Sequence, residues 1–255
     1  MQVLDHGEVN LVESWGSDEH IIRAARQSTD GAFRGWGPLP CPRCEGDGWY
    51  DTTPNGYRPP CDKCDGTGKV PGDEKLLSYL YTHRHMTPFE MAGAIFEVKA
   101  PIFVFREWHR HRTQSYNEMS ARYVEMPEEC YLPSIERLMA GAQAKANKQA
   151  STEGITEETA KMIQAEICAN NGHAHWSYRI LLEHGLSREL ARTVLPVSQY
   201  SKMWASANLR NWMQFLELRN DAAAQWEIQQ YAKAVQSLLK ARFPRTIELF
   251  EVKGD

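Results

Sequence analysis

Two copies of one cysteine pattern near the N-terminus limit most strongly how this chain can fold. Residues 41–48 and residues 61–68 both read CxxCxGxG, inside a segment rich in Gly, Pro and Cys that covers residues 31–72. A segment of this composition has no helical periodicity and cannot bury enough apolar surface to build its own core. It therefore needs cross-links, either disulfides or a metal ion, to hold one structure.

The spacing of the four cysteines favours a metal ion. The N-terminus lacks the basic and apolar regions of a secretory signal, and disulfides are rare in chains without one. Zinc takes four ligands in a tetrahedron, and each CxxC turn presents two thiolates to one ion. We therefore expect residues 37–71 to be a zinc-binding insertion whose closed site is structural. Its ligands would be Cys41, Cys44, Cys61 and Cys64.

The role of this insertion stays open. The repeat resembles the cysteine-rich module of the Hsp40 chaperones over residues 41–68 only, and four unliganded thiols in a floppy loop are the alternative. A zinc ribbon can bind nucleic acid, a partner protein or a neighbouring subunit. Positive and negative side chains balance within it, so no anion preference follows from the composition. They are Arg43, Arg58, Lys63 and Lys69 against Asp47, Asp51, Asp62 and Asp65.

Composition and charge exclude several classes of protein. With 255 residues, 42% of them hydrophobic, the chain can form one large domain, residues 1–255, with the insertion inside it. A net charge of −4 excludes a globally basic nucleic-acid binder. No run of about 18 apolar residues is present, so we expect no membrane span and a cytoplasmic protein.

Helical patterns dominate from Gly72 onward, with strand-like stretches such as residues 94–98 between them. Capping residues and helix breakers set the limits, because Thr156 can begin a long helix, Gly185 can end it, and Pro244 can end the last one. Residues 140–154 are either an exposed helix or a mobile connection. The expected helices are residues 18–26, 73–86, 156–184, 187–192 and 208–242.

A dense polar cluster at residues 110–123 is the strongest signal of function. It holds three arginines, a histidine, two serines, an asparagine and a glutamate, and it follows the apolar run 100–105. A cluster after a buried segment can be held rigidly, as an anion site requires. Arginine forks match phosphate oxygens, and Ser120 with nearby N–H groups can complete a phosphate cradle. Taken alone, the cluster is also consistent with a solvated basic face or a strip that contacts RNA.

The same stretch resembles the signature of the flavin-dependent thymidylate synthases, RHRxxSxNExSxRY, at every specified position. Nearly the whole chain outside the insertion is similar to this family. The insertion lies where members usually have a short loop, and it resembles the version in some phage-encoded members. The other similar stretches are residues 24–28, 76–80, 85–90, 98–103, 189–196 and 224–231.

The resemblance implies a fold and a reaction. The fold is α+β, with a curved, largely antiparallel sheet flanked by helices, in a homotetramer whose flavin sites are built from several subunits. The reaction makes dTMP from dUMP, with methylenetetrahydrofolate as carbon donor, NADPH as reductant and FAD as hydride carrier. Neither a membrane nor nucleic acid is then expected as a partner, and a phage-encoded enzyme would act in the host cytoplasm.

The resemblance also implies roles for individual residues. Ser120 and Arg122 are the expected phosphate anchors, and Arg192 reaches the nucleotide from a separate helix. The implied nucleotide contacts are Glu107, Arg110, Glu118, Ser120, Ala121, Arg122, Arg192 and Arg219. The implied flavin contacts are Ser28, His85, Thr87, Arg110, His111, Arg112, Glu118, Asn208, Arg210 and Gln214.

Helical spacing also predicts that the side chain of Arg219 faces inward. It lies on an apolar stripe, and a charge that faces inward needs an anionic or carbonyl partner. Spacing alone leaves a structural salt bridge in the core as one explanation. The resemblance implies instead that Arg219 is catalytic, because it would polarise the uracil ring and stabilise negative charge at N3 and the neighbouring oxygens. The stripe consists of Trp212, Phe215, Leu216, Ala222, Ala223 and Trp226.

Three positions depart from the usual family residues. Glu107 stands where Gln is frequent, Gln214 where Asn is frequent, and Ala223 where some members have His. The negative charge of Glu107 is expected to alter nucleotide affinity.

The remaining reactive side chains have no matched role. Cys130 and Cys168 are expected to be buried structural cysteines, which agrees with a family that uses no enzymatic cysteine. Ser120 has no identifiable base beside it, so we expect it to bind rather than to attack. The histidines expected to serve only in surface or core packing are His109, His173, His175 and His184.

Two other functions compete with this one. The first is a zinc-dependent nucleic-acid-binding protein without catalysis, in which the arginine cluster reads phosphates. The second is a flavoprotein of this fold that has lost methylation, although Ser120 and Arg219 are intact.

Overall fold

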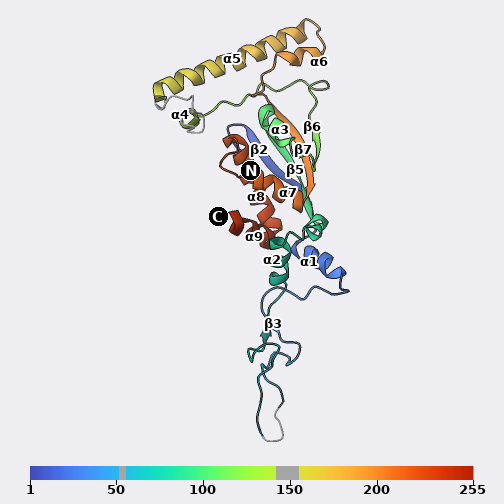
Figure 1. The fold of residues 1–255 in the computed structure, drawn as a ribbon. Helices are drawn as coiled ribbons and strands as arrows, with labels where there is room; N and C mark the ends of the chain where they lie inside the picture. Colours follow the sequence, from blue (N-terminus) through green and yellow to red (C-terminus); the bar gives the residue numbers. More distant parts are fainter. Residues whose placement is uncertain (52–55, 142–154, 255) are drawn as a thin grey trace. The chain divides into compact units, whose positions relative to one another are not determined.

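The main sheet has five strands in the order β1-β2-β5-β7-β6 in the computed structural model (Figure 1). β1 (Gln2–Val3) pairs antiparallel with β2 (Gly7–Trp15), and β6 (Ser115–Glu118) pairs antiparallel with β7 (Tyr200–Asn208). β5 (Gly93–Pro101) lies between β2 and β7 and contains the predicted strand 94–98. Together with the helices, this sheet confirms the expected α+β fold.

Alternating burial explains why these segments are strands. Along β5, the side chains of Phe96, Val98 and Ala100 are fully buried, whereas the residues between them are only half-buried. A period of two places every second side chain on one face of a sheet. The same alternation buries Met203 and Ala205 in β7.

The structure describes residues 1–51, 56–141 and 155–254. The chain divides into two compact units. Unit 1 consists of Met1–Glu13, Ile95–Ala207 and Phe215–Val235, and unit 2 consists of Ser14–Ala94, Asn208–Gln214 and Gln236–Asp255.

Unit 1 contains a group of helices around one long helix. α5 (Glu157–Glu183) packs against α4 (Ile135–Gly141) and against α6 (Arg188–Ala191) with the adjoining 3-10 turn η2 (Arg192–Val194), as Figure 1 shows. α3 (Ile102–Trp108) directly follows β5. No helix among the described residues is both long enough and apolar enough to cross a membrane.

The predicted limits of the long helix are confirmed. The Thr156 hydroxyl accepts a hydrogen bond from the N–H of Thr159 at 3.2 Å, which satisfies a free donor of the first turn. At the other end Gly185 has a φ of +81°, the left-handed conformation that ends many helices. The predicted short helix after Ser187 is also present, as α6 and η2.

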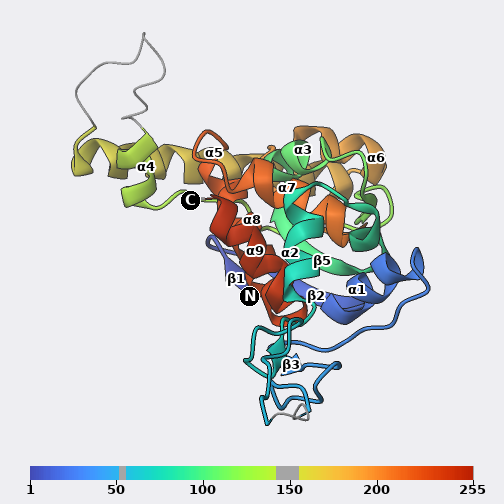
Figure 2. The ribbon, with the colours of Figure 1, turned by 60° about the horizontal axis from the view of Figure 1, so that its bottom comes forward.

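Unit 2 contains four helical segments that pack on one another. They are α1 (Asp18–Gln27), α2 (Glu74–Thr82), the 3-10 turn η1 (Thr87–Met91) and α9 (Pro244–Gly254). Figure 2 shows α9 beside α2. α1 lies close to its predicted limits, whereas α2 ends at Thr82 and not at the predicted residue 86.

A buried carboxylate joins α1 to α9. Asp18 is 6% exposed and accepts hydrogen bonds from the N–H of Arg245 and from the N–H and hydroxyl of Thr246. These N–H groups belong to the first turn of α9, where a negative charge is stabilising. The contact explains why Asp18, at the start of its own helix, is not exposed.

The predicted last helix 208–242 is wrong in extent. It is two helices, α7 (Leu209–Arg219) and α8 (Trp226–Arg242), because the Asp221 side chain accepts the N–H of Ala223 and so holds a turn between them. Pro244 does not end the helical region but begins α9, since proline is favoured in a first helical turn. Of residues 140–154, the first two end α4, and residues 142–154 lie outside the described part of the chain.

The apolar stripe predicted around Arg219 is only half correct. Trp212, Phe215 and Leu216 are fully buried in α7, as expected. Ala222, Ala223 and Trp226 are exposed, because the helix has already ended before them. Arg219 therefore lies at the end of a buried stripe and not within one.

Candidate functional site

The polar cluster at residues 110–123 is fixed to the core of unit 1 by α3. Trp108, the last residue of α3, is fully buried and packs on Phe215 with ring centroids 4.5 Å apart. Its indole N–H donates to the Gln114 side chain at 3.0 Å, and the Tyr116 hydroxyl donates to the carbonyls of Trp108 (3.1 Å) and His111 (2.7 Å). The loop between α3 and β6 is thus held at both ends, as an anion site requires.

Arg219 is anchored against this loop by three contacts. Its Nη1 lies 3.1 Å from the Glu107 carboxylate, its Nη2 donates to the Glu107 carbonyl at 2.9 Å, and its Nε donates to Nε2 of His111 at 2.9 Å. The Arg219 side chain is 16% exposed. The inward-facing charge therefore does have an anionic partner, as the salt-bridge explanation requires. Glu107 and Arg219 are far apart in sequence, so no spacing rule could have predicted this pair.

His111 is a neutral acceptor at this position. It is 8% exposed, and burial together with the charge of Arg219 lowers its pKa to about 4. Because Nε2 accepts the hydrogen bond from Arg219, the ring proton belongs on Nδ1. Phe215 packs edge-on against the ring at 4.9 Å, which holds its orientation.

Two of the residues predicted to bind the nucleotide, Arg122 and Arg192, contact the same glutamate. Arg122 forms an ion pair with Glu189 at 3.4 Å, and Nε of Arg192 donates to the Glu189 carbonyl at 3.3 Å. The Ser120 hydroxyl accepts the N–H of Arg122 at 3.3 Å, so the turn through Ala121 is closed. Arg122 and Glu189 are both more than half exposed, and such a pair contributes little to stability.

Three other predicted residues of unit 1 are solvent-exposed. Arg110 and Arg112 flank His111, and Glu118 ends β6. Of the predicted nucleotide contacts, all eight belong to unit 1.

The predicted flavin residues of unit 2 gather around η1 and α7. The Asn208 side chain caps α7 by accepting the N–H of Asn211 at 3.0 Å, and the Leu209 N–H donates to the Ala92 carbonyl at 2.7 Å. Arg210 forms an ion pair with Glu90 in η1, the turn that also carries Thr87.

The others lie on the surface of unit 2. His85, Thr87 and Gln214 are exposed, and the His85 ring stacks on Tyr79 at 5.7 Å. The Ser28 hydroxyl donates to the Ala25 carbonyl at 2.9 Å, at the end of α1.

The four predicted zinc ligands converge. All four sulfurs lie within 4.8 Å of one another, with 3.8 Å between Cys41 and Cys61 and 3.7 Å between Cys44 and Cys64. Tetrahedral zinc with Zn–S bonds of about 2.3 Å places its sulfurs roughly 3.8 Å apart. The thiols are buried, and the N–H of Gly48 points at the Cys44 sulfur at 3.2 Å. The donor set and its spacing therefore fit one zinc ion.

The two cysteine turns are built alike. β3 (Leu39–Pro40) and β4 (Lys69–Val70) pair antiparallel at the base of the insertion, and Cys41 and Cys61 each donate their N–H to a glycine carbonyl of the other repeat. Gly48 and Gly68 have positive φ angles and pack so closely that a side chain on either would meet the backbone of the opposite repeat. The second glycine of each CxxCxGxG repeat is required by this close approach.

The thiols differ in acidity within the cluster. Burial raises the pKa of Cys41, but hydrogen bonds from the backbone at Arg43 and Cys44 outweigh it and lower that pKa to about 7. Burial and neighbouring thiols raise the pKa of Cys64 to about 11. A bound cation would favour the thiolate at both positions.

The other two cysteines do not both fit the expectation of buried structural residues. Cys130 is half-buried, with its sulfur 3.8 Å from the Gln199 side chain, and burial raises its pKa. Cys168 is exposed on α5, so its predicted burial is wrong. The same Gln199 side chain lies 2.6 Å from the buried His175, which packs in the core as expected.

The chain is similar to known proteins over nearly its whole length. The family model described as thymidylate synthase complementing protein matches residues 10–245. A flavin-dependent thymidylate synthase of Thermus thermophilus is 40% identical over 249 residues, which cover 98% of this chain and 77% of that protein. One from Thermosipho africanus is 35% identical over 257 residues, covering 100% of this chain and 96% of that protein.

A solved structure is similar over nearly the whole chain. It is the UMP/dUMP methylase PolB from Streptomyces cacaoi bound with 5-Br dUMP, with a TM-score of 0.74 and 32% identity. The similarity covers 99% of this chain and 97% of that one. The same methylase bound with 5-Br UMP gives a TM-score of 0.72 at 30% identity, covering 98% and 96%.

Proposed function

The chain belongs to the flavin-dependent thymidylate synthase family, and on this premise we propose that it makes dTMP by reductive methylation of dUMP. Methylenetetrahydrofolate supplies the carbon, and FAD reduced by NADPH supplies the hydride. The observation that carries the proposal is the anchored Arg219 beside the signature cluster at residues 110–123.

The nucleotide phosphate is bound by Ser120, Arg122 and Arg192. Arg122 is already paired with an exposed carboxylate, Glu189, and a phosphate dianion competes well for such a weakly held guanidinium. Arg192 donates to the backbone carbonyl of the same residue, so both arginines lie next to Glu189. These contacts orient the two arginines until the nucleotide arrives.

Arg219 polarises the uracil ring. Three of its N–H groups bind Glu107 and His111, and a guanidinium has five, so two have no partner among the described residues and are available to a carbonyl oxygen of the base next to N3. The three contacts fix the direction of the free N–H groups before the substrate binds. A donor held in this way stabilises developing negative charge without having to reorient.

His111 contributes by staying neutral. With a pKa of about 4 it carries no charge near pH 7, so it accepts from Arg219 and adds no second positive charge beside it. A protonated imidazole would have no lone pair for Arg219 and would repel it.

The residues proposed to hold FAD fit an anionic dinucleotide. Arg110 and Arg112 are exposed guanidinium groups, and bidentate pairing with phosphate is the interaction that arginine favours. The bound flavin would supply the redox chemistry, while the chain positions it and keeps it next to the base. The other proposed contacts are Ser28, His85, Thr87, His111, Glu118, Asn208, Arg210 and Gln214.

Residues 37–71 are proposed to form a structural zinc insertion within the synthase domain, residues 1–255. The support is the four-sulfur cluster, whose spacing fits zinc, and the small buried core of the segment, which consists, among the described residues, of the four cysteines with Tyr50 and Val70 packed against them. We also propose a homotetramer as the active assembly, since the family builds its flavin sites from several subunits.

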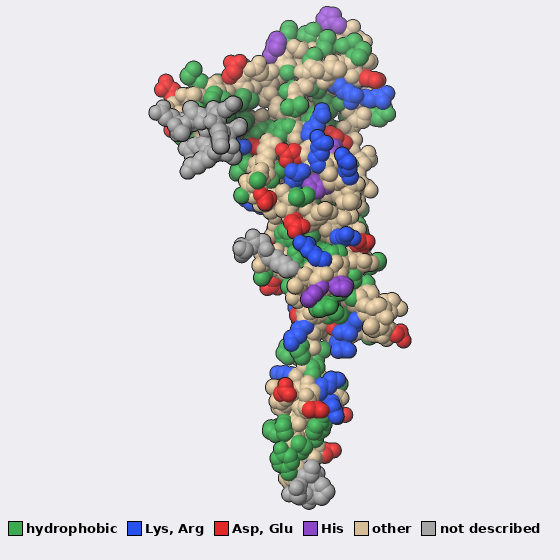
Figure 3. All heavy atoms as spheres, in the orientation of Figure 1, with side chains coloured by type: hydrophobic (Ala, Val, Ile, Leu, Met, Phe, Trp, Pro, Cys, Tyr) green, Lys and Arg blue, Asp and Glu red, His purple; other side chains and the backbone are tan. Residues whose placement is uncertain are grey.

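Nucleic-acid binding by the insertion is not favoured. Arg43 pairs with Asp62 at 3.0 Å, and Arg58 pairs with Asp47, so two of its cations are already neutralised. Figure 3 shows basic and acidic side chains side by side over this part of the surface. RNA binding whose affinity falls steeply with salt concentration would instead indicate a nucleic-acid-binding protein.

The flavin gives a direct test of the proposal. Purified protein should be yellow, and its flavin should be reduced by NADPH faster when dUMP is present. A colourless protein that does not take up added FAD would contradict the proposed function.

A further inference from the structure

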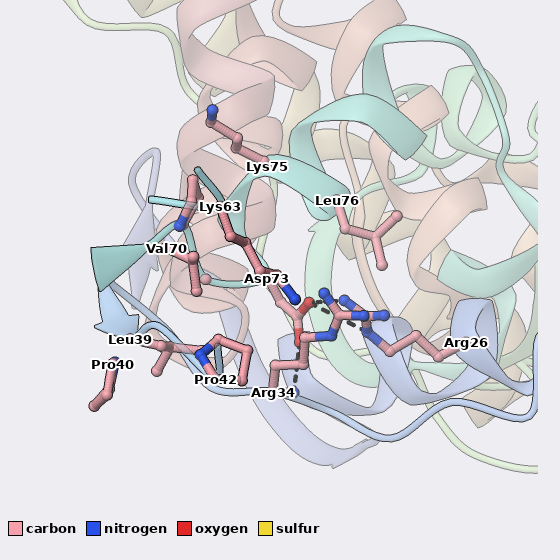
Figure 4. Close-up of a pocket in the computed structure, with 12 residues that line it drawn as sticks. Arg26, Arg34, Leu39, Pro40, Pro42, Lys63, Val70, Asp73, Lys75 and Leu76 are labelled. Atoms are coloured by element: carbon pink, nitrogen blue, oxygen red, sulfur yellow. Dashed lines mark hydrogen bonds and ion pairs between the residues drawn. The ribbon is translucent and has the colours of Figure 1, made fainter. Parts of the chain in front are cut away.

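Unit 2 contains a cavity of about 840 Å³ that the proposed reaction does not use. It lies where the base of the insertion meets α1 and α2, and Figure 4 shows the side chains around it. Its apolar walls come from Leu39, Pro40, Pro42, Val70 and Leu76. A cavity of this size holds a ligand much larger than a water molecule or a simple ion.

The cavity carries excess positive charge. Arg26 is neutralised by Asp73, which is only 1% exposed. Arg34, Lys63 and Lys75 also line the cavity, and none of these three side chains has a carboxylate partner in the part of the chain that the structure describes. Three positive charges thus remain for a ligand.

The frame of the cavity is already formed. Besides binding Arg26, the Asp73 carboxylate accepts the N–H of Arg34 at 2.7 Å, and the Asp73 N–H donates to the Gly35 carbonyl at 3.0 Å. These contacts tie the two ends of the insertion to each other and to α1. A ligand therefore does not have to order this backbone on binding.

We propose that this cavity binds the oligo-γ-glutamate tail of the folate co-substrate. The inference rests on the proposed function, because it assumes that a folate is used. A chain of carboxylates matches three unpaired cations at separate points of one cavity. In Figure 4, Arg26 and Arg34 lie together with Asp73, whereas Lys63 and Lys75 lie apart from them.

The lining of the cavity favours this tail over a nucleoside phosphate. The described residues that line the cavity include no aromatic ring, which a base would use for stacking. Arg26, which lines the cavity, and Ser28, a proposed flavin contact, both belong to the end of α1.

The binding site gives the insertion a function. Lys63 lies between the proposed zinc ligands Cys61 and Cys64, so the metal-held turn would fix the position of its backbone at the cavity. The insertion then acts as one wall of a tail site, and the zinc ion makes that wall rigid.

The test compares methylenetetrahydrofolate carrying one glutamate with the form carrying five. Wild-type protein should show a KM for the pentaglutamyl form that is about tenfold lower, as three partly exposed ion pairs would give. The variant Lys63→Ala/Lys75→Ala, which keeps only Arg34 of the three cations, should reduce this difference to about twofold and keep its kcat and its KM for the monoglutamyl form. The matched control is Lys69→Ala, because Lys69 is an exposed cation of β4 that does not line the cavity.

Calorimetry with free penta-γ-glutamate tests the cavity without any reaction. Binding to the wild type that is weakened in the double variant, with zinc content unchanged, supports the site even if no dTMP is made, and so separates a failure of the proposed function from a failure of this inference. Equal KM values for the two folates in the wild type would overturn it. So would a preference that survives undiminished in the double variant, or binding of dTTP at this cavity in place of the peptide.

Discussion

Replacing Arg219 with alanine removes the group on which the proposed chemistry depends most. The variant loses the 3.1 Å ion pair with Glu107 and the hydrogen bonds to the Glu107 carbonyl and to His111, both at 2.9 Å. Hydrogen bonds to charged groups contribute about 1.5 to 3 kcal/mol each, but the Glu107 side chain is 30% exposed and can be rehydrated. We therefore expect a loss of roughly 2 kcal/mol in the free energy of unfolding, with the fold retained.

The effect on turnover should be larger than the effect on stability. Loss of one preorganised donor to developing negative charge lowers kcat by about 10²- to 10³-fold. The assay measures dTMP formation at saturating dUMP, with urea unfolding and flavin absorbance recorded on the same preparation. Arg188→Ala is the matched control, because the Arg188 side chain forms an exposed ion pair with Glu125 and has no proposed role. Near-normal turnover of Arg219→Ala would remove Arg219 from the mechanism.

Three further substitutions test other residues of the proposed nucleotide and zinc sites. Glu107→Gln keeps an acceptor for Arg219 but removes a negative charge near the nucleotide. The KM for dUMP should therefore fall about two- to threefold, while kcat changes less than in Arg219→Ala. An unchanged KM would show that this carboxylate does not influence nucleotide binding. The folded pKa of His111, about 4, is below its unfolded value near 6.5, so the unfolded state binds the proton first, and stability is lost as the pH falls from about 7 toward 4. Between pH 7 and pH 5, urea unfolding of the wild type should lose about 2 kcal/mol that His111→Gln does not lose, and equal slopes for the two proteins would refute the assignment. Cys41→Ser should release zinc and destabilise the insertion while FAD stays bound, and unchanged zinc in atomic absorption would mean that the ligand set is wrong.

The sequence predicted the helices whose ends carry strong local signals. Thr156 and Gly185 limit α5 through a cap and a left-handed glycine, and both signals act within one helical turn. The predicted helix 208–242 was wrong between Arg219 and Trp226 for an equally local reason. The turn that the Asp221 side chain holds there has the same polar composition as an exposed helical surface, so the sequence does not reveal it. Pro244 was ambiguous, since proline is compatible with the end of one helix and the start of the next.

The composition of the candidate site was predictable, but its internal contacts were not. The four cysteines were recognised from CxxC spacing because two ligands per turn are set by local geometry. The pair of Glu107 and Arg219 depends on α7 packing beside the end of α3, which no spacing rule reports. The cavity at the base of the insertion was missed for the same reason, because the balanced charge of the segment hides the three cations that the fold collects there.

Anaerobic turnover of dUMP with methylenetetrahydrofolate, NADPH and added FAD, with dTMP read by chromatography, tests the proposed reaction itself. We expect dTMP formation that requires both the folate and FAD, at a rate that falls by at least about a hundredfold in Arg219→Ala. A protein that binds FAD and dUMP and forms no dTMP under these conditions would contradict the proposed reaction.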